Sequence, residues 1–247
     1  MHRFIHKILK GYGMYFISIR NIFFWGIALL ALFMSQSSSA GGITLTGTRV
    51  IYPEQSKQVT MSLRNTSDKS SFLVQSWVEN AKGEKSHDFV VAPPLYVSGP
   101  NNENTLRLIY NGSAQNKERE TLYYFNVKSI PSVDKSKVSG QNVLMLAAIT
   151  RIKLFYRPSG LTLPAAQAPE KMRFQRTGSG VTIENPTPYY LTLAQITIGG
   201  QKVDDRMIAP HTSEQVALKS LSNNEVKFRT INDFGAVTAE IKIQLRQ

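Results

Sequence analysis

Apolar and polar residues alternate with a period of two over much of the chain beyond residue 40. The alternating apolar positions are Val59, Met61 and Leu63; Phe72, Val74 and Val78; Leu106, Leu108 and Tyr110; and Tyr123, Phe125 and Val127. Alternation of this kind is typical of β-strands that bury one face against a core. The helical period is nearly absent, so the pattern predicts an all-β fold.

Turn-forming sequences separate these predicted strands, and a change of pattern follows Pro158. The turns are NTSD at 65–68, NAKG at 80–83, APP at 92–94 and NG at 111–112. The segment SGLTLPAAQAP at 159–169 is rich in Pro and small residues, which indicates a linker. Strand-like sequence then resumes, with a hairpin-like TGSG at 177–180. We predict two antiparallel sandwiches of about 100 residues each, the usual size of an immunoglobulin-like domain. The predicted domains are 41–158 and 159–247.

The first 40 residues differ in composition from the rest. They contain no carboxylate, and their charged side chains are Arg3, Lys7, Lys10 and Arg20. The apolar run from Ile22 to Phe33 is shorter than a membrane-spanning helix, which needs about 20 residues. A basic start, a short apolar middle and the small residues of SQSSSA are typical of a secretory signal. We predict a cleavable signal peptide at 1–40, with Met1 or Met14 as the true start.

Export limits the partners that the composition allows. Without residues 1–40, the chain has 207 residues and its net charge falls from +12 to +8. It contains no cysteine, so burial rather than disulfides must stabilise the exported chain. Positive charge suits nucleic acid, anionic lipid or an acidic partner. Export and the lack of any cluster of five basic residues argue against nucleic acid, and we expect no membrane insertion of the mature chain.

Sequence motifs for catalysis are poor. Beyond residue 40 the only histidines are His87 and His211, and neither a G-x-S-x-G nor an H-E-x-x-H sequence occurs. His211, Ser213 and Glu214 are close in sequence, but neighbouring residues on an extended segment point to opposite faces. The DFG at 233–235 is most simply a turn. We therefore expect no enzyme, no cofactor and no metal site, although carboxylates from distant strands could still meet.

An unbroken apolar run from Val143 to Ile149 leads into the basic segment TRIKLFYRP. One interpretation is a central strand buried on both faces, where continuous apolar sequence is ordinary. The other is an edge strand, and a soluble protein keeps a long apolar edge only if a partner or a loop covers it. Spacing in the sequence does not choose between these two interpretations.

Four stretches resemble the signature sequences of the periplasmic pilus (fimbrial) chaperones, the PapD-like family. They are RETLYYFNVKSIP at 119–131, RIKLFYRP at 151–158, ENPTPYYLTL at 184–193 and INDFG at 231–235. They occur in the family's order and approximate spacing. The resemblance implies two immunoglobulin-like β-sandwich domains in an L-shaped (boomerang) arrangement, located in the periplasm. Such a chaperone binds pilin subunits by donor-strand complementation, lending them an edge strand, and delivers them to an outer-membrane usher.

On this resemblance, the apolar run is the strand lent to the client. Leu144, Leu146 and Ala148, at alternate positions, match the donor residues of the family. Burying a leucine contributes about 1.5–3 kcal/mol, so the two leucines should contribute more than the alanine. Met145 and Ile149 have the opposite parity, and a shift of one residue would present their face instead.

Two charged groups also follow from the resemblance. Arg49 and Lys153 match the cations that bind the C-terminal carboxylate of the subunit, to which arginine offers a planar fork and lysine a compact charge. Glu120, Arg157 and Asp233 match an interdomain salt-bridge network, which would specify geometry more than raise stability.

Some questions stay open at this level. An exported two-domain adhesin or carbohydrate-binding protein is the alternative, and it would expose aromatic platforms. A client-free chaperone can also self-associate. The APP sequence at 92–94 resembles a family turn that can hold a cis peptide, and the sequence does not give its isomer.

Overall fold

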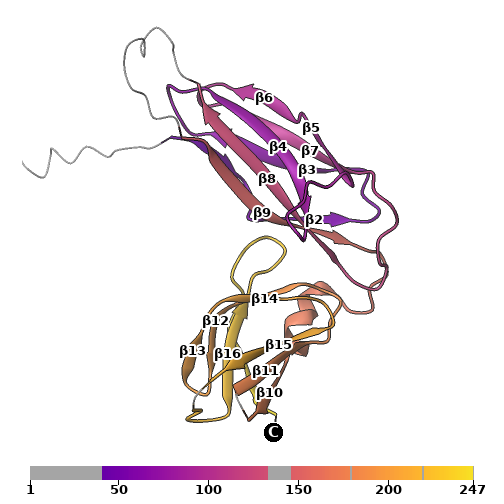
Figure 1. Cartoon of the computed structure of the whole chain (residues 1–247), viewed down its shortest axis with the longest axis vertical. Coiled ribbons are helices and arrows are strands. Elements are labelled where there is room, and N and C mark those ends of the chain that lie inside the picture. Colours follow the sequence, from indigo (N-terminus) through magenta and orange to yellow (C-terminus); the bar gives the residue numbers. More distant parts are fainter. Residues whose placement is uncertain (1–40, 133–145, 179, 219, 247) are drawn as a thin grey trace, which may run out of the picture. The chain divides into compact units, whose positions relative to one another are not determined.

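A computed structural model describes residues 41–132, 146–178, 180–218 and 220–246 (Figure 1). The predicted signal peptide and Leu144 lie outside the described residues. Within the described residues, no helix combines the length and the apolar character that a membrane crossing requires.

The first sandwich consists of two sheets. Its strands are β1 (Ile43–Leu45), β2 (Arg49–Pro53), β3 (Val59–Asn65), β4 (Phe72–Asn80), β5 (Phe89–Ala92), β6 (Leu95–Ser98), β7 (Glu103–Tyr110), β8 (Thr121–Pro131) and β9 (Ala148–Arg157). One sheet has the order β1-β3-β7-β5, and the other has the order β2-β9-β8-β4-β6 (Figure 1). The peptide bond between Ala92 and Pro93, in the APP turn, is cis.

The second sandwich also consists of two sheets. Its strands are β10 (Arg173–Thr177), β11 (Gly180–Asn185), β12 (Leu191–Ile198), β13 (Gln201–Val203), β14 (Arg206–Ile208), β15 (Thr212–Ala217), β16 (Glu225–Thr230) and β17 (Ile241–Gln244). The sheet β10-β11-β15 faces a sheet of order β13-β12-β16-β17, in which β14 also pairs with β12. The predicted hairpin at 177–180 joins β10 to β11. The prediction of an all-β fold with two sandwiches is confirmed.

Each sandwich has its own apolar core. The alternating residues of β3, β4, β7 and β8 belong to the first core, where Leu106, Leu108 and Phe125 are fully buried. The second core is built around Phe174 and Phe228, whose ring centroids lie 5.4 Å apart. Period-two alternation therefore located the buried faces correctly.

The segment predicted as a linker is more ordered than its composition suggests. It contains a 3₁₀ helix, η1 (Ala165–Lys171), and the side chain of Ala168 is fully buried in the second core. The Tyr189 hydroxyl donates a hydrogen bond to the carbonyl of Leu163 in the same segment. Pro and Ala in this segment thus shape a packed connection, because a small side chain fits close to the core where a larger one would not.

Two buried asparagines occupy equivalent places, each at the end of the second strand from an edge. Asn65 ends β3, and its side-chain amide donates to the carbonyls of Ser70, Ser98 and Gly99. Asn185 ends β11, and its amide donates to three carbonyls in the same way. Each side-chain oxygen accepts the backbone N–H two residues later. One amide thus satisfies several carbonyls at a corner of each sandwich.

The chain closes the second sandwich without a disulfide. After β17, the backbone N–H of Leu245 donates to Asn224 O at 2.8 Å. The N–H of Arg246 then donates to Phe174 O, and Arg176 N donates to Arg246 O, each at 2.8 Å. The last residues therefore leave the sheet of β16 and pair with β10 in the opposite sheet. This crossing connects the two sheets by hydrogen bonds.

We predict that Asn185→Ala lowers the free energy of unfolding by about 2–4 kcal/mol, because it leaves several buried carbonyls without a donor. Asn223→Ala is the matched control, since Asn223 is exposed and accepts a single hydrogen bond from Glu225 N. We expect the control to change the free energy by less than about 1 kcal/mol. Urea unfolding followed by circular dichroism measures the free energy of unfolding of both variants. Equal effects of the two substitutions would contradict a stabilising role of the Asn185 hydrogen bonds.

Candidate functional site

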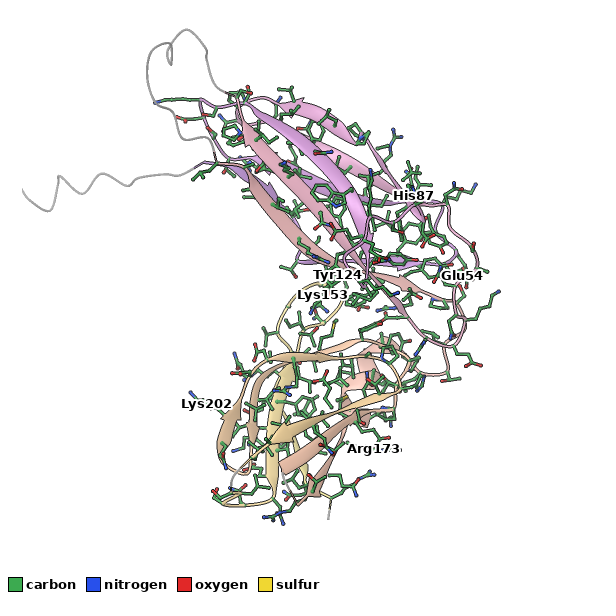
Figure 2. The ribbon with its side chains drawn as sticks, viewed as in Figure 1. Glu54, His87, Tyr124, Lys153, Arg173 and Lys202 are labelled. Atoms are coloured by element: carbon green, nitrogen blue, oxygen red, sulfur yellow. The ribbon has the colours of Figure 1, made fainter. Side chains whose placement is uncertain are left out.

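Arg49 and Lys153 lie side by side in the first sandwich, although 104 positions separate them in the sequence. Arg49 begins β2, Lys153 lies in the middle of β9, and the two residues are register partners in a parallel ladder. On its other side, Lys153 is the register partner of Tyr124 on β8, and Figure 2 shows these two residues close together. The sheet thus places two cations at adjacent positions on one face.

Residues of the second sandwich contact both cations. Arg49 NH1 donates to the carbonyl oxygen of Ile231 at 2.9 Å, and Lys153 Nζ donates to Thr192 Oγ1 at 3.2 Å. Both acceptors are neutral. Among the described residues, no carboxylate lies within ion-pair distance of either cation, and the buried Nε of Arg49 has no acceptor. The pair is held in position while its charge is left uncompensated.

The surroundings make this charge costly. Burial lowers the pKa of Arg49, while the more distant charges of Asp233 and Glu120 oppose that shift. Burial also lowers the pKa of Lys153, and the positive charge of Arg49 lowers it further. Two cations that disfavour each other in a partly buried place are stabilised by an anion that binds both. A carboxylate is the anion whose two oxygens fit an arginine fork and a lysine.

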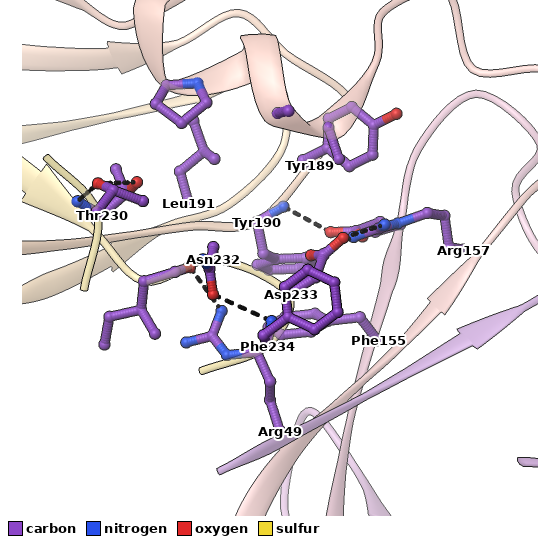
Figure 3. Close-up of a pocket in the computed structure, with 16 residues that line it drawn as sticks. Arg49, Phe155, Arg157, Tyr189, Tyr190, Leu191, Thr230, Asn232, Asp233 and Phe234 are labelled. Atoms are coloured by element: carbon purple, nitrogen blue, oxygen red, sulfur yellow. Dashed lines mark hydrogen bonds and ion pairs between the residues drawn. The ribbon is translucent and has the colours of Figure 1, made fainter. Parts of the chain in front are cut away.

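A cavity of about 290 Å³ adjoins Arg49. Figure 3 shows Arg49 with Phe155, Tyr190 and Phe234 around this space. The ring of Phe155 lies 5.6 Å from that of Tyr190, and the guanidinium carbon of Arg49 lies 5.8 Å from the Phe155 centroid. The wall beside the cation is therefore largely aromatic.

Glu120, Arg157 and Asp233 meet at the same cavity. Arg157 Nε donates to Glu120 Oε1 at 2.7 Å, and the two terminal nitrogens of Arg157 donate to the two oxygens of Asp233 at 2.7 and 2.9 Å. The second oxygen of Glu120 accepts the backbone N–H of Tyr190, and the N–H of Glu120 donates to Pro188 O. The residue before β8, the last residue of β9 and the loop after β16 are thus joined in one hydrogen-bonded group.

The Glu120 side chain is only 1% exposed. Burial raises the pKa of its carboxyl, and Arg157 and the Tyr190 N–H offset that shift only in part. For Arg157, burial alone would lower the pKa, but the hydrogen bonds and charges of Asp233 and Glu120 raise it. A buried ion pair that only partly compensates its desolvation contributes more to geometry than to stability.

Strand β9 changes its environment along its length. From Lys153 to Tyr156 it lies between β2 and β8, whereas from Ala148 to Ile152 only β8 pairs with it among the strands of the described residues. Its even-numbered residues Ile152, Leu154 and Tyr156 belong to the first core. The strand is therefore central in one half and an edge in the other. The described part of the apolar run, residues 146–149, belongs to the edge side and is not buried on both faces.

The residues before this point are exposed. Leu146 is 71% exposed, Ala148 is also exposed, and Ile149 is 58% exposed on the opposite face. Since the pairing of β8 with β9 has no register shift, Ala148 continues the face of Ile152 and Leu154. The face of β9 that packs in the core between Ile152 and Tyr156 is thus exposed at Ala148.

Several residues at the site were not predicted from the sequence. Thr192, Tyr190 and Phe234 all lie within or next to the signature stretches, but no pattern marked their side chains or backbones as contacts. Contacts made through a backbone carbonyl, such as that of Ile231, have no signal in a sequence because every residue carries one. Within the described residues, no group of three His, Cys, Asp or Glu could hold a metal ion.

The two sandwiches match two family models. Residues 42–162 match the pili and flagellar-assembly chaperone, PapD N-terminal domain, and residues 167–242 match the pili assembly chaperone PapD, C-terminal domain. Together these define a two-domain assembly chaperone of the immunoglobulin-like class.

Similar proteins agree with these matches. The chain is 43% identical over 217 residues to the chaperone protein FimC of Escherichia coli K12, which covers 87% of this chain and 90% of that protein. It is 43% identical over 221 residues to the chaperone protein FocC of Escherichia coli, with 88% and 97% covered. The periplasmic chaperone SfaE matches with a TM-score of 0.73 at 40% identity, covering 83% of this chain and 100% of that one. The chain belongs to the PapD-like family of pilus assembly chaperones.

We predict that Glu120→Gln lowers the free energy of unfolding by about 2–3 kcal/mol, because it replaces an oxygen that accepts a charged or backbone donor with a competing donor. Glu184→Gln is the control. Glu184 forms an ion pair with Arg173 in which the two side chains are 46% and 44% exposed, respectively. Loss of this pair should change the free energy of unfolding by about 0.5 kcal/mol or less. Thermal unfolding measures the stability of both variants. Equal destabilisation would mean that the buried Glu120 contributes no more to stability than an exposed ion pair.

Proposed function

We propose that this protein is a periplasmic chaperone that binds pilin subunits and delivers them to an outer-membrane usher. The main support is strand β9, which pairs with β2 along only half of its length. Its exposed apolar edge lies next to Arg49 and Lys153, the two cations without a carboxylate partner among the described residues. An open edge offers backbone hydrogen bonds, exposed apolar residues offer burial, and two cations offer a place for a chain end. A client strand that ends in a free carboxylate fits all three features at once.

Backbone pairing would supply much of the affinity. On the side away from β8, the backbone groups of Ala148–Ile152 face no other strand of the described residues. A client strand added there continues the sheet, which is the recognition mode of β-strand addition. Removing Leu146 from water would contribute about 1.5–3 kcal/mol in addition.

The cations would set the register of the added strand. A carboxylate bound at Arg49 and Lys153 fixes where the client strand ends, and a slip of one residue would turn its apolar face to the solvent. We propose Leu144, Leu146 and Ala148 as the donor residues. Ala148 lies on the face of the even-numbered core residues of β9, and the two leucines have the same parity in the sequence. Glu120, Arg157 and Asp233 would then keep the second sandwich in contact with the anchor.

A similar structure supports this proposal. A Salmonella enterica SafA pilin in complex with the SafB chaperone matches with a TM-score of 0.75 at 27% identity, covering 85% of this chain and 99% of that chain. The family match favours this function over an adhesin or a carbohydrate-binding protein.

We predict that Lys153→Ala reduces recovery of a co-expressed pilin from the periplasm at least tenfold, since loss of one charge-assisted hydrogen bond costs about 1.5–3 kcal/mol. Lys202→Ala removes an equal charge from an exposed position in the second sandwich and should leave recovery unchanged. Co-purification on a tagged chaperone measures both. Undiminished capture by Lys153→Ala would refute the anchor.

A second pair of variants tests the register of the donor strand. Leu146→Ser should weaken capture of the same pilin, whereas Ile149→Ser should have little effect, because the two residues face opposite sides and both are exposed. Neither residue is buried, so both variants should unfold at the temperature of the original protein. The opposite ranking would mean that the odd-numbered face enters the client.

A further inference from the structure

The turn after β16 is held unusually firmly for an exposed loop. The side-chain oxygen of Asn232 accepts the backbone N–H groups of Phe234 and Ala236, and Gly235 N donates to Asn232 O. Asp233 is fixed by its two hydrogen bonds to Arg157. Gly235 has a φ of 84°, and a Cβ at this position would clash with the hydroxyl of Thr48. The backbone on either side of Phe234 is thereby fixed.

Phe234 lies at the tip of this turn and is 93% exposed. An exposed aromatic ring contributes almost nothing to the fold, because the hydrophobic gain requires removal from water. Yet the ring lies at the wall of the cavity that adjoins Arg49 (Figure 3). Arg49 also donates to the carbonyl of Ile231, three residues earlier. Residues 231–234 therefore carry the ring of Phe234 and also accept the hydrogen bond of Arg49.

The cavity has the size for one side chain, and part of its wall is apolar. Its volume of about 290 Å³ is at the lower end for ligand sites, and Phe155, Pro169 and Leu191 line it together with Phe234. In a polypeptide chain, the Cβ of the last residue is two bonds from the carboxylate carbon, a distance of about 2.5 Å. A carboxylate bound to Arg49 thus brings the last side chain of a chain to the cavity.

We propose that this cavity binds the side chain of the client's C-terminal residue, and that Phe234 is a specificity-determining residue for an apolar side chain at that position. The inference rests on the proposed function, because it assumes that the client's carboxylate binds at Arg49 and Lys153. The positive pair selects a free chain end, and the apolar wall selects which residue stands there. A polar last side chain would lose its water in a cavity whose charged groups, Glu120, Arg157 and Asp233, are already paired with one another.

Strand-forming peptides with alternating valine and threonine test this proposal. One peptide ends in leucine and another in serine, both with a free α-carboxylate, and a third ends in leucine amide. Fluorescence anisotropy with the full exported chain should give about tenfold tighter binding of the leucine-ended peptide than of the serine-ended one. Phe234→Ala should reduce this ratio to about twofold or less, and Phe234→Leu should retain most of it.

Val237→Ala is the matched control, because Val237 is an exposed apolar residue of the same loop that does not line the cavity. It should leave the leucine-to-serine ratio unchanged. A ratio that stays at about tenfold in Phe234→Ala, or is absent in the original protein, overturns the role of the cavity. Binding of the amide as tight as that of the free acid, or no binding of any peptide, contradicts the anchor and with it the proposed function.

Discussion

The short parallel ladder between β2 and β9 is the constraint on which the rest of the structure depends. It pairs Arg49–Pro53 with Lys153–Arg157 and ends there. Within these bounds β9 is a central strand of the first core, and N-terminal to them it becomes an edge. Because β2 starts at Arg49, the end of the ladder and the position of the two cations are the same place. The buried half of β9, its open edge and the position of the two cations thus all follow from the register between β2 and β9.

The ion-pair group around Arg157 follows from the same strand. Arg157 is the last residue of β9, so the register that places Lys153 beside Arg49 also places the guanidinium next to Glu120 and Asp233. Glu120 additionally exchanges two hydrogen bonds with the backbone at Pro188 and Tyr190. Its carboxylate is desolvated at a cost that Arg157 only partly offsets. Such a group is suited to selecting one geometry, because any other arrangement leaves a buried charge unpaired.

The sequence could predict what depends on periodicity and little of what depends on backbone contacts. Alternation at Val59 to Leu63 or Tyr123 to Val127 identified strands and their buried faces, since side-chain period reports directly on which face is apolar. The composition of the η1 segment predicts a linker, but the segment is packed. Small residues and prolines occur both in flexible linkers and in packed connections, so composition does not distinguish the two. The half-covered state of β9 could not be predicted either, since it depends on where β2 begins. Contacts such as Arg49 to Ile231 O involve a carbonyl that carries no sequence identity.

The neutral acceptors of the two cations are the most informative feature of the site. A carboxylate in place of Thr192 Oγ1 or Ile231 O would neutralise Lys153 or Arg49 permanently and leave little to attract an incoming anion. A carbonyl and a hydroxyl instead orient the donors while leaving their charge in place. Burial lowers the pKa of both residues, which means that the charged forms are held at a cost in the client-free protein. Binding of a carboxylate would relieve that cost. The proposed binding of a negative chain end would therefore use a pair of cations that is already oriented and whose charge is not yet compensated.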